Sequence, residues 1–403
     1  MTITKIDATE ILDSRGEPTI EVTMFCNDIS STFGVPAGAS TGKKEAHELR
    51  DGGERYGGKG VKKAIARIAE ITPKLIGFEL FNQSKFDQLL IDLDGTPNKS
   101  KLGGNSIVGL SLAYTQLSAA VKKVPLWQYL SSSYGTTPGF PRLFANLVNG
   151  GKHAPGLDIQ EFMIVTKTTV IVAGIERIQK FRRLLKAEVA EAFGSGAELV
   201  GDEGGFAPTG AKAEQILKIF HSINAEVSNS FDIAIDAAAS SFYNDGKYKF
   251  ENNELTSNQL LDLYLSCSSK YGMVSVEDPF AEDDIRAWEE LAKTKHGFRV
   301  IGDDLTVTNA TLTDKFAKSG LIDGVIIKPN QIGTLTETIN TIKTANDNNI
   351  NVIVSHRSGE TTSSFISDLA YAVGAYGIKI GAPVRGERVA KYDRFLEIVK
   401  EIQ

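Results

Sequence analysis

The sequence predicts an α/β fold: an eightfold (β/α) barrel of the TIM type, preceded by a smaller α+β domain at the N-terminus. Three observations predict it. The 403 residues exceed what one hydrophobic core usually supports, so two domains are expected. The first part of the chain reads as strands and then helices, which is typical of an α+β domain. The second half repeats short apolar segments at the spacing of strand–helix units, which is typical of a barrel.

The N-terminal segment is predicted to form strands followed by helices. Residues 3–35 alternate in strand fashion, most clearly from Thr19 to Phe25. A loop of small residues from Gly34 to Gly42 follows, and we expect it to be a mobile lid. Apolar residues recur at three- and four-residue steps from Val61 to Ile71 and from Ser106 to Val121, which predicts two helices.

A domain boundary is expected near residue 135. The segment from Ser131 to Gly139 is rich in turn-forming residues and is the predicted linker. We therefore predict an α+β domain over residues 1–135, which carries the lid loop 34–42, and a barrel over residues 136–403. The roughly 260 residues after the linker are about the size of one eightfold barrel.

Six apolar segments of the second half each end on a charged or ionisable residue. A buried parallel strand reads as a short apolar run, and barrel enzymes carry their chemistry at the carboxyl ends of such strands. We therefore expect these side chains to meet at one rim of the barrel. In chain order, the end residues are Asp236, Glu277, Asp303, Lys328, His356 and Lys379.

Three of these end residues are carboxylates: Asp236, Glu277 and Asp303. One acid at a strand end is more often a helix cap than a metal ligand. Three acids at one dry rim would repel one another unless a cation lay among them. Oxygen ligands without cysteine favour Mg²⁺ over zinc, so the sequence predicts a magnesium site.

Two of the end residues are lysines with apolar neighbours, Lys328 and Lys379. Such a lysine is rarely an ordinary surface residue. It can form a structural ion pair with one of the acids. It can also act as a base, because a metal ion and the other lysine would lower its pKa. The residues alone leave both interpretations open.

Several further segments carry candidate binding or catalytic groups. The guanidinium fork of Arg357 and the hydroxyl of Ser358, next to His356, suit a phosphate or carboxylate. Polar residues also stand at the edges of apolar segments or between glycines, where an ordinary loop is the alternative. These weaker candidates are Asn149-Gly-Gly-Lys-His153, Gln160-Glu161-Phe162 and Gly201-Asp202-Glu203-Gly204-Gly205.

Composition limits the functional classes. The chain is 41% hydrophobic and 23% charged, with a net charge of −6. This argues against nucleic-acid binding, although an anionic substrate remains possible at a local basic cluster. Cys26 and Cys267 form no CxxC pair, so no zinc or redox motif is expected. With no long apolar run and no signal-peptide pattern, a cytoplasmic protein without a membrane span is expected.

Taken together, the motifs resemble the enolase family from about residue 4 to 394. The matching segments are long, numerous and in one order. They are Ile11-Leu-Asp-Ser-Arg-Gly16, Gly38-Ala-Ser-Thr-Gly42, Asn98-Lys-Ser-Lys-Leu102, Asn149-Gly-Gly151, Gln160-Glu-Phe-Met-Ile164, Val200-Gly-Asp-Glu-Gly-Gly-Phe-Ala-Pro208, Val276-Glu-Asp-Pro-Phe-Ala-Glu-Asp-Asp284, Gly302-Asp-Asp-Leu-Thr-Val-Thr-Asn309, Asn330-Gln-Ile-Gly-Thr-Leu-Thr336, Ser355-His-Arg-Ser-Gly-Glu-Thr361 and Gly381-Ala-Pro383 with Glu387-Arg388.

The resemblance implies a barrel with irregular early strands and a hydro-lyase, phosphopyruvate hydratase. This enzyme reversibly dehydrates 2-phosphoglycerate to phosphoenolpyruvate in glycolysis and gluconeogenesis. Lys328 would remove the proton on C2. Glu203 would act as the general acid on the C3 hydroxyl, with Glu161 in its hydrogen-bond network.

The resemblance also implies a ligand for each part of the substrate and two Mg²⁺ ions, the second arriving with substrate. Arg357 and Ser358 would bind the phosphate, Lys379 would face the substrate carboxylate, and the two histidines would lie at the substrate. The implied residues are thus His153, Glu161, His356, Arg357, Ser358 and Lys379 for substrate, Asp236, Glu277 and Asp303 for the first ion, and Ser40 for the second.

A homodimer or higher homo-oligomer is also implied. Glu397 departs from the family here, because an arginine often stands at this position and pairs across the dimer with a strand glutamate, Glu21 in this chain. Two alternatives stay open: a non-catalytic binding paralogue on the same fold, and another proton-abstracting enzyme of the enolase superfamily.

Overall fold

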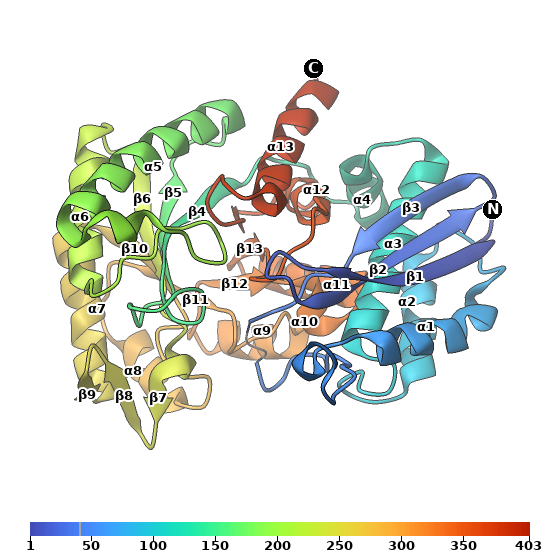
Figure 1. Cartoon of the computed structure of the whole chain (residues 1–403), viewed down its shortest axis with the longest axis horizontal. Helices are drawn as coiled ribbons and strands as arrows, with labels where there is room; N and C mark the ends of the chain where they lie inside the picture. The colour runs from blue at the N-terminus through green and yellow to red at the C-terminus, as the bar shows by residue number, and fades with distance from the viewer. Residues whose placement is uncertain (40–41) are drawn as a thin grey trace.

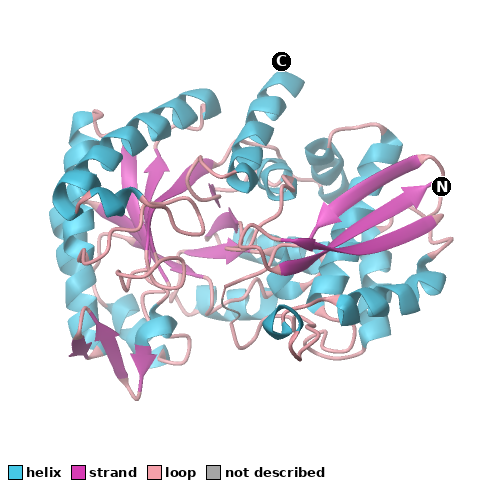
Figure 2. Cartoon of the chain, viewed as in Figure 1, coloured by secondary structure: helices cyan, strands magenta, loops and turns pink. Residues whose placement is uncertain are grey.

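The computed structural model of the chain describes residues 1–39 and 42–403. A separate N-terminal domain lies beside a closed barrel (Figure 1). The N-terminal domain holds an antiparallel sheet of order β1-β2-β3, covered on one side by helices (Figure 2). Its elements are β1 (Lys5–Leu12), β2 (Pro18–Cys26), β3 (Ile29–Gly34), the 3-10 helix η1 (Arg55–Gly58), α1 (Lys62–Leu75), α2 (Gln83–Asp94), α3 (Gly104–Lys122) and α4 (Leu126–Tyr134).

The alternation in β2 decides how the sheet packs. Ile20, Val22 and Met24 point to one face of the strand and are fully buried. That face packs on α3, a helix buried along most of its length. The strands and helices expected in this domain are therefore present.

The predicted linker is wrong in its first half, because α4 continues through Tyr134. Turn-forming residues predicted a loop from Ser131 onward, but Tyr129, Leu130 and Ser131 are buried and α4 packs on a helix of the barrel domain. Tertiary packing therefore outweighed the low helix propensity of the serines. The helix ends at Gly135, whose φ of 65° is the left-handed conformation common at helix ends.

The barrel is closed, with the strand order β10-β11-β12-β13-β14-β4-β5-β6. Its interior is filled by a compact apolar cluster that includes Phe144, Met163 and Ile326. The strands are β4 (Arg142–Asn149), β5 (Glu161–Thr166), β6 (Phe231–Asp236), β10 (Met273–Glu277), β11 (Arg299–Gly302), β12 (Gly324–Ile327), β13 (Asn351–Ser355) and β14 (Gly377–Lys379). The eightfold barrel predicted from the strand ends is thereby confirmed.

Helices surround the barrel, and a small sheet of order β7-β8-β9 projects from one edge (Figures 1 and 2). The helices are α5 (Ile171–Phe193), η2 (Ser195–Glu198), α6 (Ala213–Glu226), η3 (Ala239–Phe242), α7 (Ser257–Tyr271), α8 (Ile285–Lys293), α9 (Ala310–Lys318), α10 (Pro329–Ile332), α11 (Leu335–Asp347), α12 (Phe365–Ala372) and α13 (Gly386–Glu401). The projecting strands are β7 (Tyr243–Asn244), β8 (Lys247–Phe250) and β9 (Asn253–Leu255).

One early strand, β5, runs antiparallel to both of its neighbours, whereas the other barrel pairs are parallel. Its first residue, Glu161, lies opposite Asn149 at the end of β4 and opposite Asp236 at the end of β6. The start of β5 therefore reaches the same rim as the ends of the other strands. This reversal confirms the irregular early strands.

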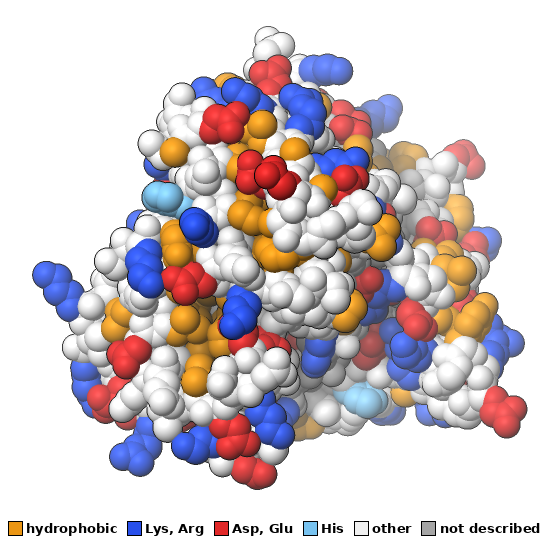
Figure 3. Space-filling view, turned by 60° about the vertical axis from the view of Figure 1, so that its left-hand side comes forward, with side chains coloured by type: hydrophobic (Ala, Val, Ile, Leu, Met, Phe, Trp, Pro, Cys, Tyr) orange, Lys and Arg blue, Asp and Glu red, His pale blue; other side chains and the backbone are white. Residues whose placement is uncertain are grey.

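The surface carries charges of both signs. On the face in Figure 3, acidic and basic side chains are interspersed among polar and apolar ones. Among the described residues, no helix combines the length and apolar character needed to cross a membrane.

The two domains are joined by a buried polar network centred on Asp87 of α2. Its Oδ2 accepts hydrogen bonds from the backbone N–H (2.9 Å) and the hydroxyl (2.6 Å) of Thr336 in the first turn of α11. Its Oδ1 accepts from Ser111 (2.7 Å) and Gln83 (2.9 Å). Ser111 in turn accepts from the backbone N–H of Leu335. A carboxylate of one domain thus caps the positive end of a helix in the other.

We expect Asp87 to make folding stability fall as the pH rises from about 4 to about 7. Burial raises the pKa of Asp87 to about 6, whereas an unfolded aspartate titrates near 4. The folded state then holds the proton more tightly, so this stabilisation is complete below pH 4 and is lost as the pH passes 6. The loss amounts to about 3 kcal/mol.

Urea unfolding of the wild type and Asp87→Asn between pH 4 and 7 checks this expectation. The stability of the variant relative to the wild type should rise by up to about 3 kcal/mol across the interval. Asp92→Asn, on the exposed side of the same helix, is the matched control. A stability difference for Asp87→Asn that does not change with pH would contradict the assignment.

Candidate active site

A cavity at the carboxyl ends of the barrel strands collects the predicted residues. Each described candidate lines it except Glu277, which is buried and contacts Lys379. Ser40, the remaining candidate, lies outside the described residues. The lining residues are Gly38, Ala39, Glu45, His153, Gln160, Glu161, Glu203, Asp236, Ala238, Asp278, Asp303, Asp304, Lys328, His356, Arg357, Ser358 and Lys379.

The strands position these side chains because each apolar run stops at the rim. Asp236 and Glu277 are the last residues of β6 and β10 and lie opposite each other in register. Lys379 closes β14 beside Ser355, the last residue of β13. Asp303, Lys328 and His356 directly follow their strands, so the six predicted end residues meet at one rim.

Both lysines are paired with carboxylates. The Nζ of Lys379 lies 3.1 Å from Asp236 Oδ2, 2.9 Å from Glu277 Oε1 and 3.0 Å from Glu161 Oε1. Lys328 forms an ion pair with Asp303. The ion-pair interpretation therefore describes the structure, although it does not exclude a lysine base in the substrate complex.

In the structure, the pKa values of both lysines shift in the opposite direction to the lowering expected beside a metal ion. Burial lowers the pKa of Lys328, but the Asp303 and Glu277 carboxylates act against it and the pKa lies above its usual value. The pKa of Lys379 is held well above its usual value, because Asp236, Glu161 and Glu277 outweigh burial in the same way. The nearest charges to each ammonium are carboxylates rather than cations, which reverses the direction of the shift.

The charge of the cavity favours a bound cation. Carboxylates from both walls outnumber Lys328, Arg357 and Lys379 among the lining residues. Burial and the neighbouring Asp236 hold the pKa of Glu277 well above its usual value. Such crowding of oxygen ligands, with no cysteine near, suits Mg²⁺. The acidic residues of the cavity could therefore hold a metal ion.

Within the described part of the chain, two groups bring three possible ligand atoms within 4.8 Å of one another. They differ from the predicted trio of Asp236, Glu277 and Asp303, whose carboxylates are engaged by Lys379 and Lys328. The two groups are His153 with Glu161 and Glu203, and Asp278 with Asp303 and Asp304. Only Asp303 belongs to both the predicted trio and a compact group.

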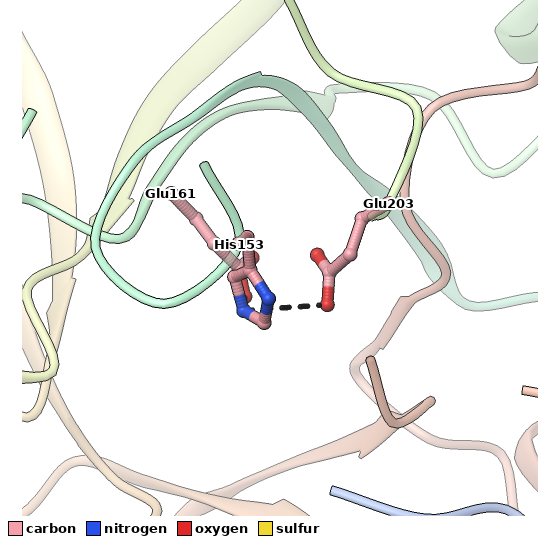
Figure 4. Close-up of side chains that lie close together, drawn as sticks. All are labelled: His153, Glu161 and Glu203. Carbon is pink, nitrogen blue, oxygen red and sulfur yellow. Dashed lines mark ion pairs between the residues drawn. The ribbon is translucent and has the colours of Figure 1, made fainter. Parts of the chain in front are cut away.

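His153 lies between two buried carboxyl groups (Figure 4). Its Nε2 is 3.5 Å from Glu203 Oε1 and 3.7 Å from Glu161 Oε1. Asn146 of β4 donates a hydrogen bond of 2.9 Å to Glu203 Oε2. The three side chains come from three separate segments and point into one space.

The two carboxyl groups have opposite pKa shifts. Burial and the neighbouring Glu203 hold the pKa of Glu161 well above its usual value. Burial also acts to raise the pKa of Glu203, but His153, His356 and Arg388 outweigh it and hold that pKa well below its usual value. Two adjacent carboxyl groups with divided pKa values can share a single proton, which is a common arrangement for acid–base chemistry.

Arg357 and Ser358, the anion-binding candidates, form hydrogen bonds with residues of the N-terminal domain. Arg357 Nη1 donates to Glu45 Oε2 at 2.9 Å and to Asn330 Oδ1 at 3.1 Å. The hydroxyl oxygen of Ser358 accepts from the backbone N–H of Ala39 at 2.6 Å and from Arg15 at 3.3 Å. The described part of the loop predicted to be a lid is also tied to the barrel, since Ala37 and Gly359 exchange two backbone hydrogen bonds.

Sequence reasoning missed several residues that support the site. Asn146 could have been found, because a polar residue inside an apolar strand needs a partner. Arg15 and Arg388 stand inside segments that resemble a known family, but their spatial partners are distant in sequence. Glu45 follows the lid as an ordinary charged residue and carries no local signal.

Comparison with known proteins agrees with this geometry. The family model described as the enolase N-terminal domain matches residues 3–130, and that of the enolase C-terminal TIM barrel domain matches residues 139–403. The chain is 42% identical to the enolase of a Nitratiruptor species, over 99% of this chain and 97% of that protein. It is 45% identical to the enolase of Lactobacillus acidophilus, over 99% and 95% respectively. It is 42% identical to the enolase of Elusimicrobium minutum, over 99% and 96%.

Proposed function

Because the chain belongs to the enolase family, and is therefore a phosphopyruvate hydratase of glycolysis, we propose how its rim cavity dehydrates 2-phosphoglycerate. Lys328 is the base that removes the C2 proton, and Glu203 is the acid that protonates the departing C3 hydroxyl. The products are phosphoenolpyruvate and water. The same two groups exchange roles in the reverse direction.

The observation that carries this proposal is the position of the two groups on opposite walls. In the closed order of eight strands, β12 and β5 are four strands apart. Lys328 directly follows β12, and Glu161 opens β5 beside Glu203. A substrate between them would lose its proton to one wall and its hydroxyl to the other.

The substrate would be oriented by the cationic side chains of the cavity. Arg357 and Ser358 bind the phosphate, since both are already placed by contacts with Glu45, Ala39 and Arg15. Lys379 faces the substrate carboxylate. His153 and His356 contact the substrate near Glu203, because both imidazoles lie beside that carboxyl group.

We propose two Mg²⁺ ions for each site, the first held by Asp236, Glu277 and Asp303 and the second by Ser40. Bound Mg²⁺ would offset the second negative charge that develops on the substrate carboxylate when the C2 proton leaves. If a cation engages Asp303, the influences that lower the pKa of Lys328 remain. They are the burial of Lys328 and the nearby positive charges of Arg357 and Lys379. These influences favour the neutral amine that a base requires.

The acid would draw on the Glu161–Glu203 pair. Glu161, with its raised pKa, is the member of the pair that holds a proton more tightly. Passage of that proton to Glu203 prepares the acid for the C3 hydroxyl. Glu161 is thus proposed to take part in catalysis with Glu203.

An ultraviolet assay tests the proposed function directly. Purified protein with Mg²⁺ and 2-phosphoglycerate should raise the absorbance of phosphoenolpyruvate, and a chelator should stop the reaction. A folded protein that gives no signal would point to the non-catalytic alternative. Proton exchange in another carboxylic acid, without turnover of 2-phosphoglycerate, would point to a different enzyme of the superfamily.

We expect Mg²⁺ alone to raise the thermal unfolding midpoint, because a bound cation relieves the repulsion among Asp236, Glu277 and Asp303. Ligand at about 100 times its Kd stabilises the folded state by about 2.7 kcal/mol. Glu277→Gln should lose most of this shift, whereas Asp314→Asn, at a partly exposed position on α9, should keep it. Thermal scans with Mg²⁺ or a chelator measure the effect, and an undiminished shift in Glu277→Gln would refute the assignment.

We further propose a homodimer or higher homo-oligomer that acts in the cytoplasm, with loop 34–42 as a closing lid and a domain boundary between residues 135 and 136. Family membership supports these assignments. Glu397 pairs with Arg394 on its own helix at 2.9 Å, so an oligomer would use other contacts than the usual arginine. Light scattering after size-exclusion chromatography gives the oligomeric state.

A further inference from the structure

Arg388, in the first turn of α13, is fully buried and does not line the cavity. It nevertheless contacts three consecutive residues of the site. Its Nη1 donates to the carbonyl oxygen of Arg357 at 2.7 Å, and its Nη2 donates to that of Ser358 at 2.6 Å. The same Nη1 lies 2.7 Å from Nδ1 of His356. A buried guanidinium at this position therefore acts on the site from outside the cavity.

The contact with His356 restricts how that imidazole carries its proton. A guanidinium remains charged in proteins and offers only donors. The Nδ1 atom of His356 must therefore accept the hydrogen bond, so it carries no proton. Both the imidazolium and the Nδ1–H tautomer are disfavoured, and the neutral ring carries its proton on Nε2.

The protonated nitrogen faces the proposed acid. Nε2 of His356 lies 3.3 Å from Oε1 of Glu203, and both side chains are buried. Burial lowers the pKa of His356 to about 4 and the positive charge of Arg388 acts in the same direction, although Glu203 opposes them. The imidazole is thus neutral near pH 7, and its Nε2, which has no hydrogen-bond partner among the described residues, lies beside the carboxyl group.

We propose that Arg388 is a positioning residue that holds His356 as the neutral Nε2–H tautomer beside Glu203. The inference rests on the proposed function for the role of Glu203 as acid. With the other tautomer, an Nε2 lone pair would face Glu203 and accept its proton. That proton would then be held by His356 rather than directed at the C3 hydroxyl. Arg388 therefore keeps the proton of Glu203 available to the substrate.

Substitutions of Arg388 test whether this residue sets the tautomer of His356 or only supports the loop that carries Arg357 and Ser358. Arg388→Met keeps an apolar side chain of similar reach but removes every donor, whereas Arg388→Lys retains a charged donor. We expect kcat for dehydration to fall about 10- to 100-fold in the Met variant, with partial recovery in the Lys variant. C2 proton exchange, which needs Lys328, should change much less. A loss confined to KM would instead indicate misplaced phosphate ligands and would overturn the proposal.

The tautomer can be measured without any activity. Long-range ¹H–¹⁵N spectra of histidine-labelled protein, assigned with a His356→Gln variant, should show the His356 proton on Nε2 in the wild type and in Arg388→Lys. Arg388→Met should shift the signals toward the Nδ1–H form, and Lys400→Met, exposed on the same helix, should not. A wild-type His356 protonated on Nδ1, or an unchanged tautomer in folded Arg388→Met, would overturn the proposal. Absence of phosphoenolpyruvate formation would contradict the proposed function and leave the tautomer result standing.

Discussion

Replacing Lys328 with alanine is expected to abolish both the formation of phosphoenolpyruvate and the exchange of the C2 proton of 2-phosphoglycerate with solvent. Lys328 directly follows β12, four strands from β5 in the closed barrel, and its ammonium forms an ion pair with Asp303. General-base groups contribute about 10²- to 10⁴-fold, so both rates should fall by at least 10²-fold.

The exchange is measured by NMR, as deuterium incorporated at C2 of 2-phosphoglycerate recovered from D₂O. Lys318→Ala, exposed on α9, is the matched control and should retain both rates. Because Lys328→Ala leaves Asp303 without its partner, circular dichroism and the Mg²⁺-dependent thermal shift should confirm that the site is folded. Wild-type exchange in a folded Lys328→Ala variant would exclude Lys328 as the base.

Replacing Glu203 with glutamine is expected to stop dehydration and to preserve C2 exchange. Glutamine matches the shape of glutamate and can keep a contact with Asn146, but it cannot donate a carboxyl proton to the C3 hydroxyl. The loss in dehydration should again be about 10²- to 10⁴-fold. Exchange depends on the opposite wall and should stay within a few-fold of the wild type.

The same two assays check this division. Glu191→Gln, exposed on α5, serves as the control. Equal loss of exchange and dehydration in Glu203→Gln would contradict the assignment of separate walls to base and acid. The pair of variants therefore tests the topology of the site as well as the two residues.

The barrel could be predicted because apolar strands ending on charged residues leave a clear pattern in the sequence. The reversal of β5 could not be read in this way, since a fully buried strand such as Glu161–Thr166 has the same apolar pattern in either direction. The helix through Ser131–Tyr134 was missed for a related reason. Its stability comes from packing against α12, which no local propensity reports.

The rim residues were predictable from their positions, but their partners were not. Arg15 and Ser358 are 343 residues apart, and Arg388 and His356 are 32 apart, so only the folded structure brings them together. The direction of the lysine pKa shifts depended on such partners. The sequence predicted that a metal ion and a second lysine would lower the pKa of each lysine. In the structure, carboxylates 2.9 to 3.1 Å from Lys379 raise the pKa of Lys379 instead.

The contacts between the first forty residues and the last fifty have a consequence for synthesis on the ribosome. Ser358 is held by Ala39 and Arg15, and His356 by Arg388, so the site needs both ends of the chain. At about 5 to 20 residues per second, Arg388 is translated roughly 20 to 75 s after Arg15. The N-terminal domain can fold during that interval, but its half of the site has no partner surface until Arg388 has been translated. Activity is therefore expected only from chains in which the segment up to Arg388 has left the ribosome.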